Sequence, residues 1–152
     1  MKSREITKMK IETLMTKSLI TLQLDDDLNK AKDIFATHNI HHILINDDDG
    51  ALAGVITDRD LFKQLSPTIG TSKETPRDIT LAQQKVHQIM SRDLISAQKE
   101  QSINDAVLLF HDNHISCLPV IDEKSRAIGI ITWRDILKVI ALQYRRKLSN
   151  QN

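Results

Sequence analysis

The feature that most constrains the fold of this chain is a repeat. Residues 10–65 align without a gap with residues 85–140, which lie 75 positions further on, and 16 of the 56 aligned positions are identical. The most similar stretch is 54–61, Gly-Val-Ile-Thr-Asp-Arg-Asp-Leu, which recurs as Gly-Ile-Ile-Thr-Trp-Arg-Asp-Ile at 129–136. An ungapped match of this length indicates an internal duplication.

Each copy predicts the same order of elements, β-α-β-β-α. A short apolar segment precedes an amphipathic helix, two strands follow with a turn between them, and the second strand leads directly into another helix. The residues between the copies include Pro67, Gly70 and Pro76 without a sustained period, which indicates a linker or a loop with a helical turn. We therefore divide the chain into a polar lead-in (1–9), repeat 1 (10–65), a linker (66–84), repeat 2 (85–144) and a C-terminal tail (145–152).

Composition narrows the classes of partner. A hydrophobic content of 40% with 27% charged residues is typical of a globular protein. A net charge of +1 and only 3% aromatic residues argue against nucleic acid and anionic membranes as partners. The chain has a single cysteine, Cys117, which excludes an internal disulfide. The sequence shows neither the apolar core of a signal peptide nor an apolar run of about 20 residues that could span a membrane. We expect a cytoplasmic protein.

Both copies resemble the CBS domain (the cystathionine-β-synthase domain), and the tandem resembles a Bateman module. The resemblance covers roughly residues 10–144 and rests on Ile11-x-x-Leu14-Met15, Ala31, Phe35, 40–45 and 54–60 in repeat 1 and on 115–122 and 129–135 in repeat 2. It implies an α+β (α/β) fold in which the two repeats pack about a pseudo-two-fold axis. It further implies two clefts for adenosine-containing ligands (AMP, ADP, ATP, S-adenosylmethionine or an NAD-type dinucleotide), a homodimer, no catalytic residues and no required cofactor.

The Thr-x-Arg-Asp motif of each copy offers suitable chemistry for such a ligand. A carboxylate can accept both vicinal hydroxyls of a ribose, and a hydroxyl with backbone N–H groups at a helix start can hold a phosphate. An arginine beside them can pair with the same phosphate. Thr-x-x-Asp before an apolar run is, however, also nearly a capping box, in which the threonine and the acid only terminate the helix. Both interpretations stay open at the sequence level.

By alignment with the family, each cleft joins strand starts from one repeat to the helix start of the other. One cleft takes Thr16, Ile20, His41 and His42 with Thr132, Trp133, Arg134 and Asp135; the other takes Ser91, Ile95, Ser116, Cys117 and Pro119 with Thr57, Asp58, Arg59 and Asp60. The two clefts are not equivalent, because Asp58 would repel a polyphosphate whereas Trp133 could stack on a base. Leu44 also stands where the family usually has the proline that Pro119 retains, so the first strand of repeat 1 is expected to enter differently.

The remaining patterns have structural interpretations. His38, His41 and His42 do not make a metal site, since neighbouring strand residues face opposite ways, and residues 47–50 predict a hairpin turn. Cys117 is expected to be a core thiol. The last helix carries an extra apolar stripe that we expect to be a dimer surface, and Arg145-Arg146-Lys147 closes that helix. The sequence thus predicts a stand-alone regulatory module that senses a nucleotide and signals to a partner protein. The alternative is a structural dimerisation or scaffolding module with vestigial clefts.

Overall fold

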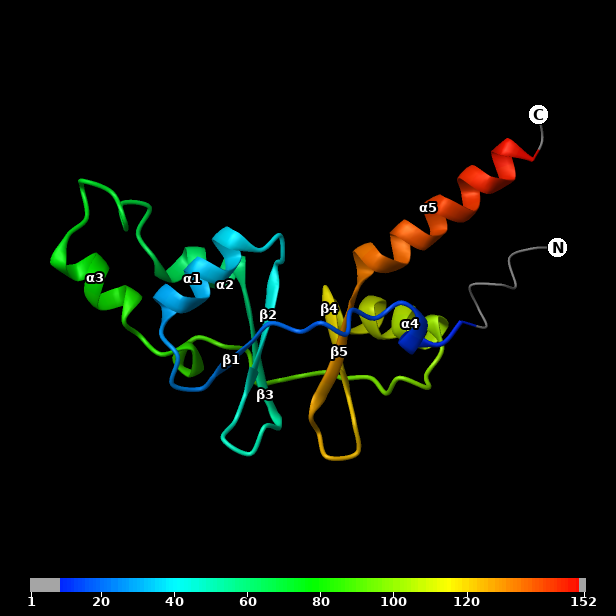
Figure 1. Cartoon of the computed structure of the whole chain (residues 1–152), viewed down its shortest axis with the longest axis horizontal. Helices are drawn as coiled ribbons and strands as arrows, with labels where there is room; N and C mark the ends of the chain where they lie inside the picture. Colours follow the sequence, from blue (N-terminus) through cyan, green and yellow to red (C-terminus); the bar gives the residue numbers. More distant parts are fainter. Residues whose placement is uncertain (1–8, 151–152) are drawn as a thin grey trace. The chain divides into compact units, whose positions relative to one another are not determined.

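The computed structural model describes residues 9–150 (Figure 1). The predicted lead-in falls mostly on residues 1–8 and so lies outside the described residues. The chain forms two compact units: unit 1 combines the N-terminal segment up to Leu19 with the chain from Ile95 onward, and unit 2 is Ile20–Leu94. No helix between residues 9 and 150 is long and apolar enough to cross a membrane.

Unit 2 is a three-stranded sheet with helices packed on it. Its elements are β1 (Thr21–Gln23), α1 (Leu28–Thr37), β2 (His42–Asn46), β3 (Leu52–Thr57), α2 (Asp58–Gln64), α3 (Pro76–Ala82) and the 3-10 turn η3 (Val86–Gln88). The strand order is β1-β2-β3, with β1 parallel and β3 antiparallel to β2. Its core is fully buried and includes Leu22, Leu28, Ile43, Ile45 and Ile56.

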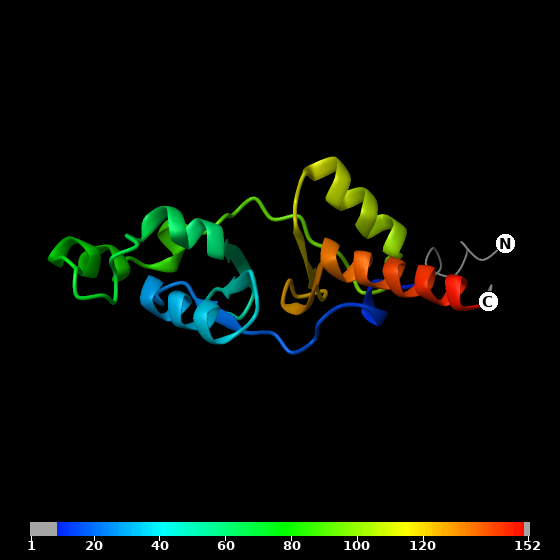
Figure 2. The same cartoon turned by 90° about the horizontal axis from the view of Figure 1, so that it is seen from above.

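Unit 1 repeats this plan with a smaller sheet. Its elements are the 3-10 turn η2 (Ile11–Thr13), α4 (Ile103–Asn113), the antiparallel strands β4 (Cys117–Ile121) and β5 (Ala127–Thr132), and α5 (Trp133–Ser149). Helices α4 and α5 lie side by side in both ribbon views (Figure 2). The mixed α and β composition and the repeated order of elements confirm the predicted fold class. Helix α5 continues through residues 145–149 of the predicted C-terminal tail.

The first strand of repeat 2 is reduced to a single bridge. The sequence predicts a strand at Ile95-Ser96, but the structure pairs only Ala97 with Val120. In repeat 1 the equivalent pairing runs from Thr21↔Leu44 onward. Alignment places Ser96 against Pro119 at that point, and proline has no N–H to donate to a neighbouring strand. The difference between Leu44 and Pro119 therefore explains why only repeat 1 has a three-stranded sheet.

The leading segments of the two repeats are exchanged between the units. Thr16 of repeat 1 pairs with Ile130 of β5, and Ser91 of repeat 2 pairs with Val55 of β3. Both contacts depend on a glycine in the strand: a Cβ added at Gly129 would lie 2.5 Å from the sulfur of Met15, and the equivalent Gly54 lies under Met90. Each unit is thus one repeat completed by the leading segment of the other.

The turns and the segment between the repeats are held by aspartates. In the first hairpin the Oδ1 atom of Asp47 accepts from the N–H groups of Asp49 and Ala51, which confirms the predicted turn. The equivalent Asp122 accepts from two N–H groups in the same way. In the segment that the sequence left as a linker or helical loop, buried Asp78 accepts from the Thr75 N–H and the Thr68 hydroxyl and anchors α3.

Candidate functional site

Strand pairing places the start of one strand beside the start of the next helix in each unit. Because β2 and β3 are antiparallel, His42 pairs with Thr57, the last residue before α2. In unit 1, Cys117 pairs with Thr132 in the same manner before α5. The first helical N–H then reaches back across the pair, from Asp58 to the carbonyl of His41 (3.3 Å) in unit 2. In each unit the predicted site residues at the strand start therefore meet those at the helix start at one corner.

A complete capping box begins each of these helices. In unit 2 the Oδ2 atom of Asp60 accepts from the Thr57 N–H (3.0 Å) and from the Thr57 hydroxyl (2.6 Å), and that hydroxyl oxygen accepts from the Asp60 N–H (3.1 Å). In unit 1 the corresponding distances between Thr132 and Asp135 are 2.7, 2.8 and 3.4 Å. The capping interpretation of Thr-x-x-Asp is therefore confirmed in both repeats.

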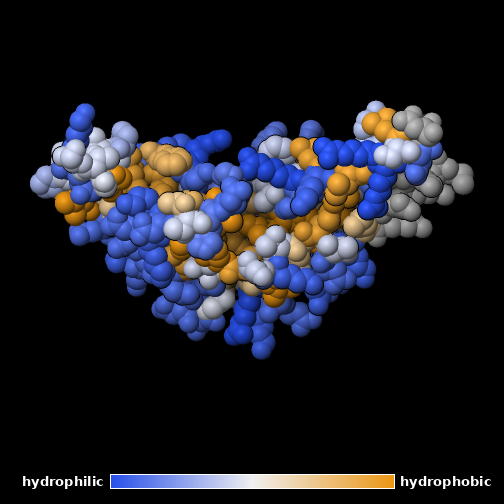
Figure 3. Space-filling model, turned by 45° about the horizontal axis from the view of Figure 1, so that its top comes forward, coloured by the Kyte–Doolittle hydropathy of each residue, from blue (hydrophilic) through white to orange (hydrophobic). Residues whose placement is uncertain are grey.

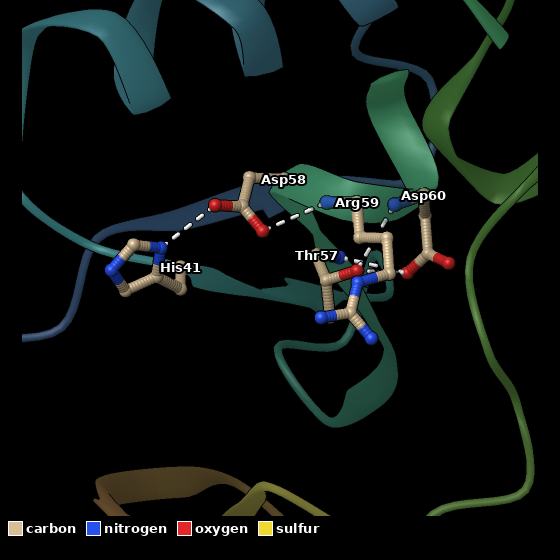
Figure 4. Close-up of polar contacts among 5 residues, drawn as sticks. All are labelled: His41, Thr57, Asp58, Arg59 and Asp60. Carbon is tan, nitrogen blue, oxygen red and sulfur yellow. Dashed lines mark hydrogen bonds and ion pairs between the residues drawn. The ribbon is translucent and has the colours of Figure 1, made fainter. Parts of the chain in front are cut away.

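The cap uses only one oxygen of each carboxylate. Within residues 9–150, the Oδ1 atoms of Asp60 and Asp135 make no hydrogen bond. Figure 4 shows the second Asp60 oxygen directed away from Thr57. Both carboxylates are partly exposed, so this oxygen is available as an acceptor. The threonine hydroxyls, in contrast, donate their protons to the acids, so the donor role predicted for them would require the cap to open.

Unit 2 has an additional side-chain hydrogen bond that the sequence did not predict. The Nδ1 atom of His41 lies 2.7 Å from the Oδ2 atom of Asp58, whose Oδ1 atom accepts from the N–H of Arg59 (2.8 Å; Figure 4). Partial burial alone would raise the pKa of Asp58, but the hydrogen bonds from His41 and Arg59 outweigh it and hold that pKa below its usual value. The signal in the sequence was a histidine before β2 and an acid after β3, which antiparallel pairing brings together.

The equivalent corner of unit 1 is aromatic and cationic. Trp133 takes the place of Asp58, its N–H donates to the carbonyl of Ser116 (3.4 Å), and its indole is 44% exposed. The guanidinium of Arg134 lies 5.7 Å from the centre of the Trp133 ring, a cation–π distance. Cys117, which pairs with Thr132, is buried, and desolvation raises the pKa of its thiol to about 12. This cysteine stays protonated, as expected of a core thiol.

The structure divides the predicted site residues between the two units. Unit 2 holds Ile20, His41, His42, Thr57, Asp58, Arg59, Asp60 and Ser91; unit 1 holds Thr16, Ile95, Ser116, Cys117, Pro119, Thr132, Trp133, Arg134 and Asp135. Ser91 pairs two residues before Thr57, and Thr16 pairs two residues before Thr132. Each leading segment therefore lies beside the helix start with which the sequence grouped it. The composite clefts, which draw on both units, remain a prediction.

A groove adjoins each corner within its own unit. The groove of unit 2, about 420 Å³, lies between α1 and α2 and has His41 and Asp58 in its lining. The groove of unit 1, about 460 Å³, lies between α4 and α5 and has Trp133 in its lining. The two grooves occupy equivalent places in the repeats but differ in character, because a polar pair in one is replaced by an aromatic side chain in the other.

Comparison with known proteins identifies the family. The family model of the CBS domain matches residues 11–67 and 86–142, which is most of the chain. The chain belongs to the CBS domain family. Its two repeats make it a CBS pair, as the resemblance noted in the sequence implies. A CBS domain-containing protein of Dictyostelium discoideum is 32% identical over 133 residues, covering 88% of this chain and 92% of that protein.

Other relatives place this CBS pair in a wider context. It is 30% identical to an inosine-5′-monophosphate dehydrogenase of Methanocaldococcus jannaschii over 129 residues, which are 85% of this chain but only 23% of that enzyme. A crystal structure of a CBS domain pair in complex with 5′-methylthioadenosine and S-adenosyl-L-methionine matches with a TM-score of 0.73 and 25% identity, covering 89% of this chain and 98% of that one. The enzyme's activity resides in a protein of which this chain matches only a small part.

Proposed function

We propose that this CBS pair is a regulatory module that binds an adenosine-containing ligand and reports its presence to a partner protein. The single observation that supports the ligand is the free carboxylate oxygen in each capping box. The cap fixes the orientation of Asp60 and of Asp135 through one oxygen. The other oxygen is then presented in a defined direction, as the recognition of a ribose hydroxyl pair requires.

The comparison structure supports the chemical class of ligand. Its CBS pair binds two adenosine derivatives, 5′-methylthioadenosine and S-adenosyl-L-methionine. Neither carries a phosphate, so the ribose and the adenine are the parts that these ligands share with AMP and ATP. A site built around the free oxygens of Asp60 and Asp135 would serve all of them, and Arg59 and Arg134 would add affinity for phosphates. Within residues 9–150 neither arginine is paired with a carboxylate.

The test is calorimetric titration with AMP, ATP, S-adenosylmethionine, 5′-methylthioadenosine and NAD. Asp60→Asn and Asp135→Asn keep an acceptor for the cap but replace the free oxygen with an amide NH₂. Loss of a charge-assisted acceptor is expected to weaken binding about 10- to 100-fold. The matched control is Asp105→Asn, because Asp105 caps α4 with the same geometry, accepting from the N–H and hydroxyl of Ser102 at 2.8 Å each.

Two outcomes would refute parts of the proposal. No heat and no thermal shift with any of the five ligands would reject the ligand-binding function. Equal affinity of Asp60→Asn, Asp135→Asn and Asp105→Asn for a ligand that does bind would reject the ribose role of the two acids. The first outcome would favour the second candidate function, a structural dimerisation or scaffolding module with vestigial clefts, to which the exposed apolar side chains of α5 would contribute a contact surface.

The remaining parts of the proposal concern assembly and location. We infer that two modules form a homodimer, as the family resemblance implies, and that the module regulates a partner protein. Sedimentation equilibrium measures the first, and a copurified enzyme whose activity responds to the ligand would establish the second. The free thiol of Cys117 is consistent with the reducing cytoplasm in which we expect the module to act.

A further inference from the structure

The thioether of Met15 lies directly on Gly129 of β5 and holds the leading segment of repeat 1 on unit 1. A Cβ added at Gly129 would lie 2.5 Å from the sulfur and 3.0 Å from the Cγ of Met15, so the thioether fills the place of a side chain there. The next residue, Thr16, donates its N–H to the carbonyl of Ile130 (2.8 Å) and accepts from the Ile130 N–H (3.0 Å). We call the contact between Met15 and Gly129 the Met15 clamp.

The two ends of this leading segment are held by different means. At its start Ile11 is fully buried, and its N–H donates to the carbonyl of Gln101 (2.8 Å). At the other end, residues 17–19 make no hydrogen bond within residues 9–150. That end is therefore held only by the pairing of Thr16 and by the Met15 clamp, whereas the start has an anchor of its own.

Oxidation would convert this thioether into a group that does not fit the clamp. A hydroperoxide gives one oxygen to the sulfur: the sulfur lone pair forms the S–O bond, the O–O bond breaks, and the other oxygen leaves as water after taking the proton. The sulfur loses two electrons, and the product is a polar sulfoxide. The nearby N–H groups of Met15, Thr16 and Ile130 already donate to backbone carbonyls. The sulfoxide oxygen would thus lie without these donors beside an apolar core.

The equivalent contact in the other repeat is better protected. Met90 lies over Gly54 in the same way but is only 7% exposed, whereas Met15 is partly exposed. The single thiol of the chain does not compete for an oxidant, because Cys117 is buried and its raised pKa keeps it protonated. Of the two thioethers that lie on strand glycines, Met15 is therefore the one that an oxidant can reach.

We propose that Met15 is a redox switch, at which sulfoxide formation releases residues 15–19 from β5 while the Ile11 end of the segment stays in place. Reduction restores the clamp: two thiols become a disulfide, return two electrons to the sulfur and remove the oxygen as water, as methionine sulfoxide reductases do. The released stretch contains Thr16, which pairs two residues before Thr132 of the candidate ligand site. Oxidation would therefore weaken a ligand held at Thr132. This last step rests on the proposed function, but the release does not.

The duplication provides matched protease sites for the test. Each of the two methionines is flanked by basic residues on both sides. These residues are Lys10 and Lys17 around Met15, and Lys85 and Arg92 around Met90. All four basic side chains are exposed, and hydrophilic side chains cover much of the face drawn in Figure 3. Trypsin cleavage of the folded protein therefore depends on whether the backbone can leave its place, and not on access to the side chain.

The experiment treats the protein with hydrogen peroxide, measures the oxidation of each methionine by peptide mass spectrometry, and then digests the protein briefly with trypsin. We expect Met15 to be oxidised roughly fivefold faster than Met90, because it is more exposed. Cleavage after Lys17 should become roughly fivefold faster in the oxidised protein, while cleavage after Lys10 and Arg92 stays unchanged. Methionine sulfoxide reductase with dithiothreitol should reverse the increase.

Variants separate Met15 from the other methionines. Met15→Leu removes the oxidisable sulfur at a similar volume and should keep cleavage after Lys17 slow with or without peroxide. Met15→Gln places a polar acceptor at a similar distance along the side chain and should speed that cleavage without peroxide. The controls are Met9→Leu, because Met9 is also partly exposed, and Met90→Leu. Both controls should respond to peroxide like the wild type.

Other results would overturn the proposal. Complete oxidation of Met15 without faster cleavage after Lys17 would show that the clamp accommodates the sulfoxide. A peroxide response that persists in Met15→Leu, or that Met9→Leu abolishes, would place the switch at another residue. If Met15→Leu does not fold by circular dichroism, singly oxidised wild-type species separated by chromatography decide between Met15 and Met9.

Titration of the reduced and the oxidised protein with the five adenosine-containing ligands tests the link to the ligand site. We expect oxidation to weaken binding about tenfold, because Thr16 loses its position, and Met15→Leu to remove this effect. Equal binding by both forms would refute the link. If neither form binds any of the ligands, the proposed function fails, whereas the redox switch is still decided by cleavage after Lys17.

Discussion

The exchange of leading segments predicts a specific coupling between Met15 and Gly129. A Cβ at residue 129 would lie 2.5 Å from the sulfur of Met15 and 3.0 Å from its Cγ, well inside contact distance. Both atoms belong to a flexible side chain, so Gly129→Ala is tolerated only if Met15 turns away. Overpacking of this kind costs about 1–3 kcal/mol, and replacing a strand glycine returns roughly 0.5 kcal/mol. We therefore expect Gly129→Ala to lower the free energy of unfolding by about 1–2 kcal/mol.

The double mutant isolates the contact. Met15→Ala alone should cost about 1–2 kcal/mol, because the side chain is half-buried against β5. In the double mutant Gly129→Ala with Met15→Ala, the new methyl group enters the space that the thioether leaves. The free energy of unfolding should therefore fall by about 1 kcal/mol less than the sum of the two single-mutant losses. Urea unfolding followed by Trp133 fluorescence measures all four proteins, since this single tryptophan lies in unit 1.

A second cycle decides between the two ways of pairing the repeats. If each repeat kept its own leading segment, Met15 would lie on Gly54 and Met90 on Gly129. The structure has the opposite pairing, so Met15→Ala and Gly54→Ala should be additive within about 0.3–0.5 kcal/mol. Coupling of Met15 to Gly54, with additivity at Gly129, would refute the exchanged arrangement. It would also move Thr16 away from Thr132.

Three further predictions follow from single residues. Leu44→Pro should remove a donor from the pairing of β1 with β2 and, at a buried position, destabilise unit 2 by about 3 kcal/mol, measured by urea unfolding. Cys117 should not react with a disulfide reagent at pH 8 until the protein is unfolded, because its thiol is buried and has a pKa of about 12; rapid reaction of the native protein would contradict this. Because the pKa of Asp58 is lowered in the folded protein, its contact with His41 stabilises the fold fully above about pH 4. This stabilisation is lost as the pH falls through the folded-state pKa of Asp58. Asp58→Asn should therefore flatten the acid limb of a plot of the free energy of unfolding against pH.

Much of the fold could be predicted because local patterns specify it. The duplication, the hairpin turn at Asp47 and the strand-to-helix corners all appear in the sequence as repeated spacing and turn chemistry. The capping boxes were equally visible, since Thr-x-x-Asp has a known backbone geometry. These features depend on residues close in the chain, and the structure confirms them.

Long-range contacts could not be predicted in the same way. The sequence shows that residues 85–90 correspond to 10–15, but not on which strand either segment packs. The pattern of a glycine in the strand and a methionine in the leading segment is identical in both copies, so it fits either pairing. The contact between His41 and Asp58 was missed for a related reason. Family alignment assigned these residues to different clefts, whereas strand pairing places them 2.7 Å apart.

The difference between the two corners bears on which ligand each would accept. In unit 2 the lowered pKa of Asp58 keeps that carboxylate ionised near neutral pH, at the same helix start as Asp60 although the two side chains point to opposite sides (Figure 4). Two carboxylates disfavour a phosphate and favour an uncharged or cationic group, such as a thioether or a sulfonium. In unit 1 Asp58 is replaced by Trp133, and Arg134 lies over its ring with no carboxylate partner among the described residues. We therefore expect the corner at Thr132 to favour nucleotides that carry phosphate and the corner at Thr57 to favour adenosine derivatives that lack it.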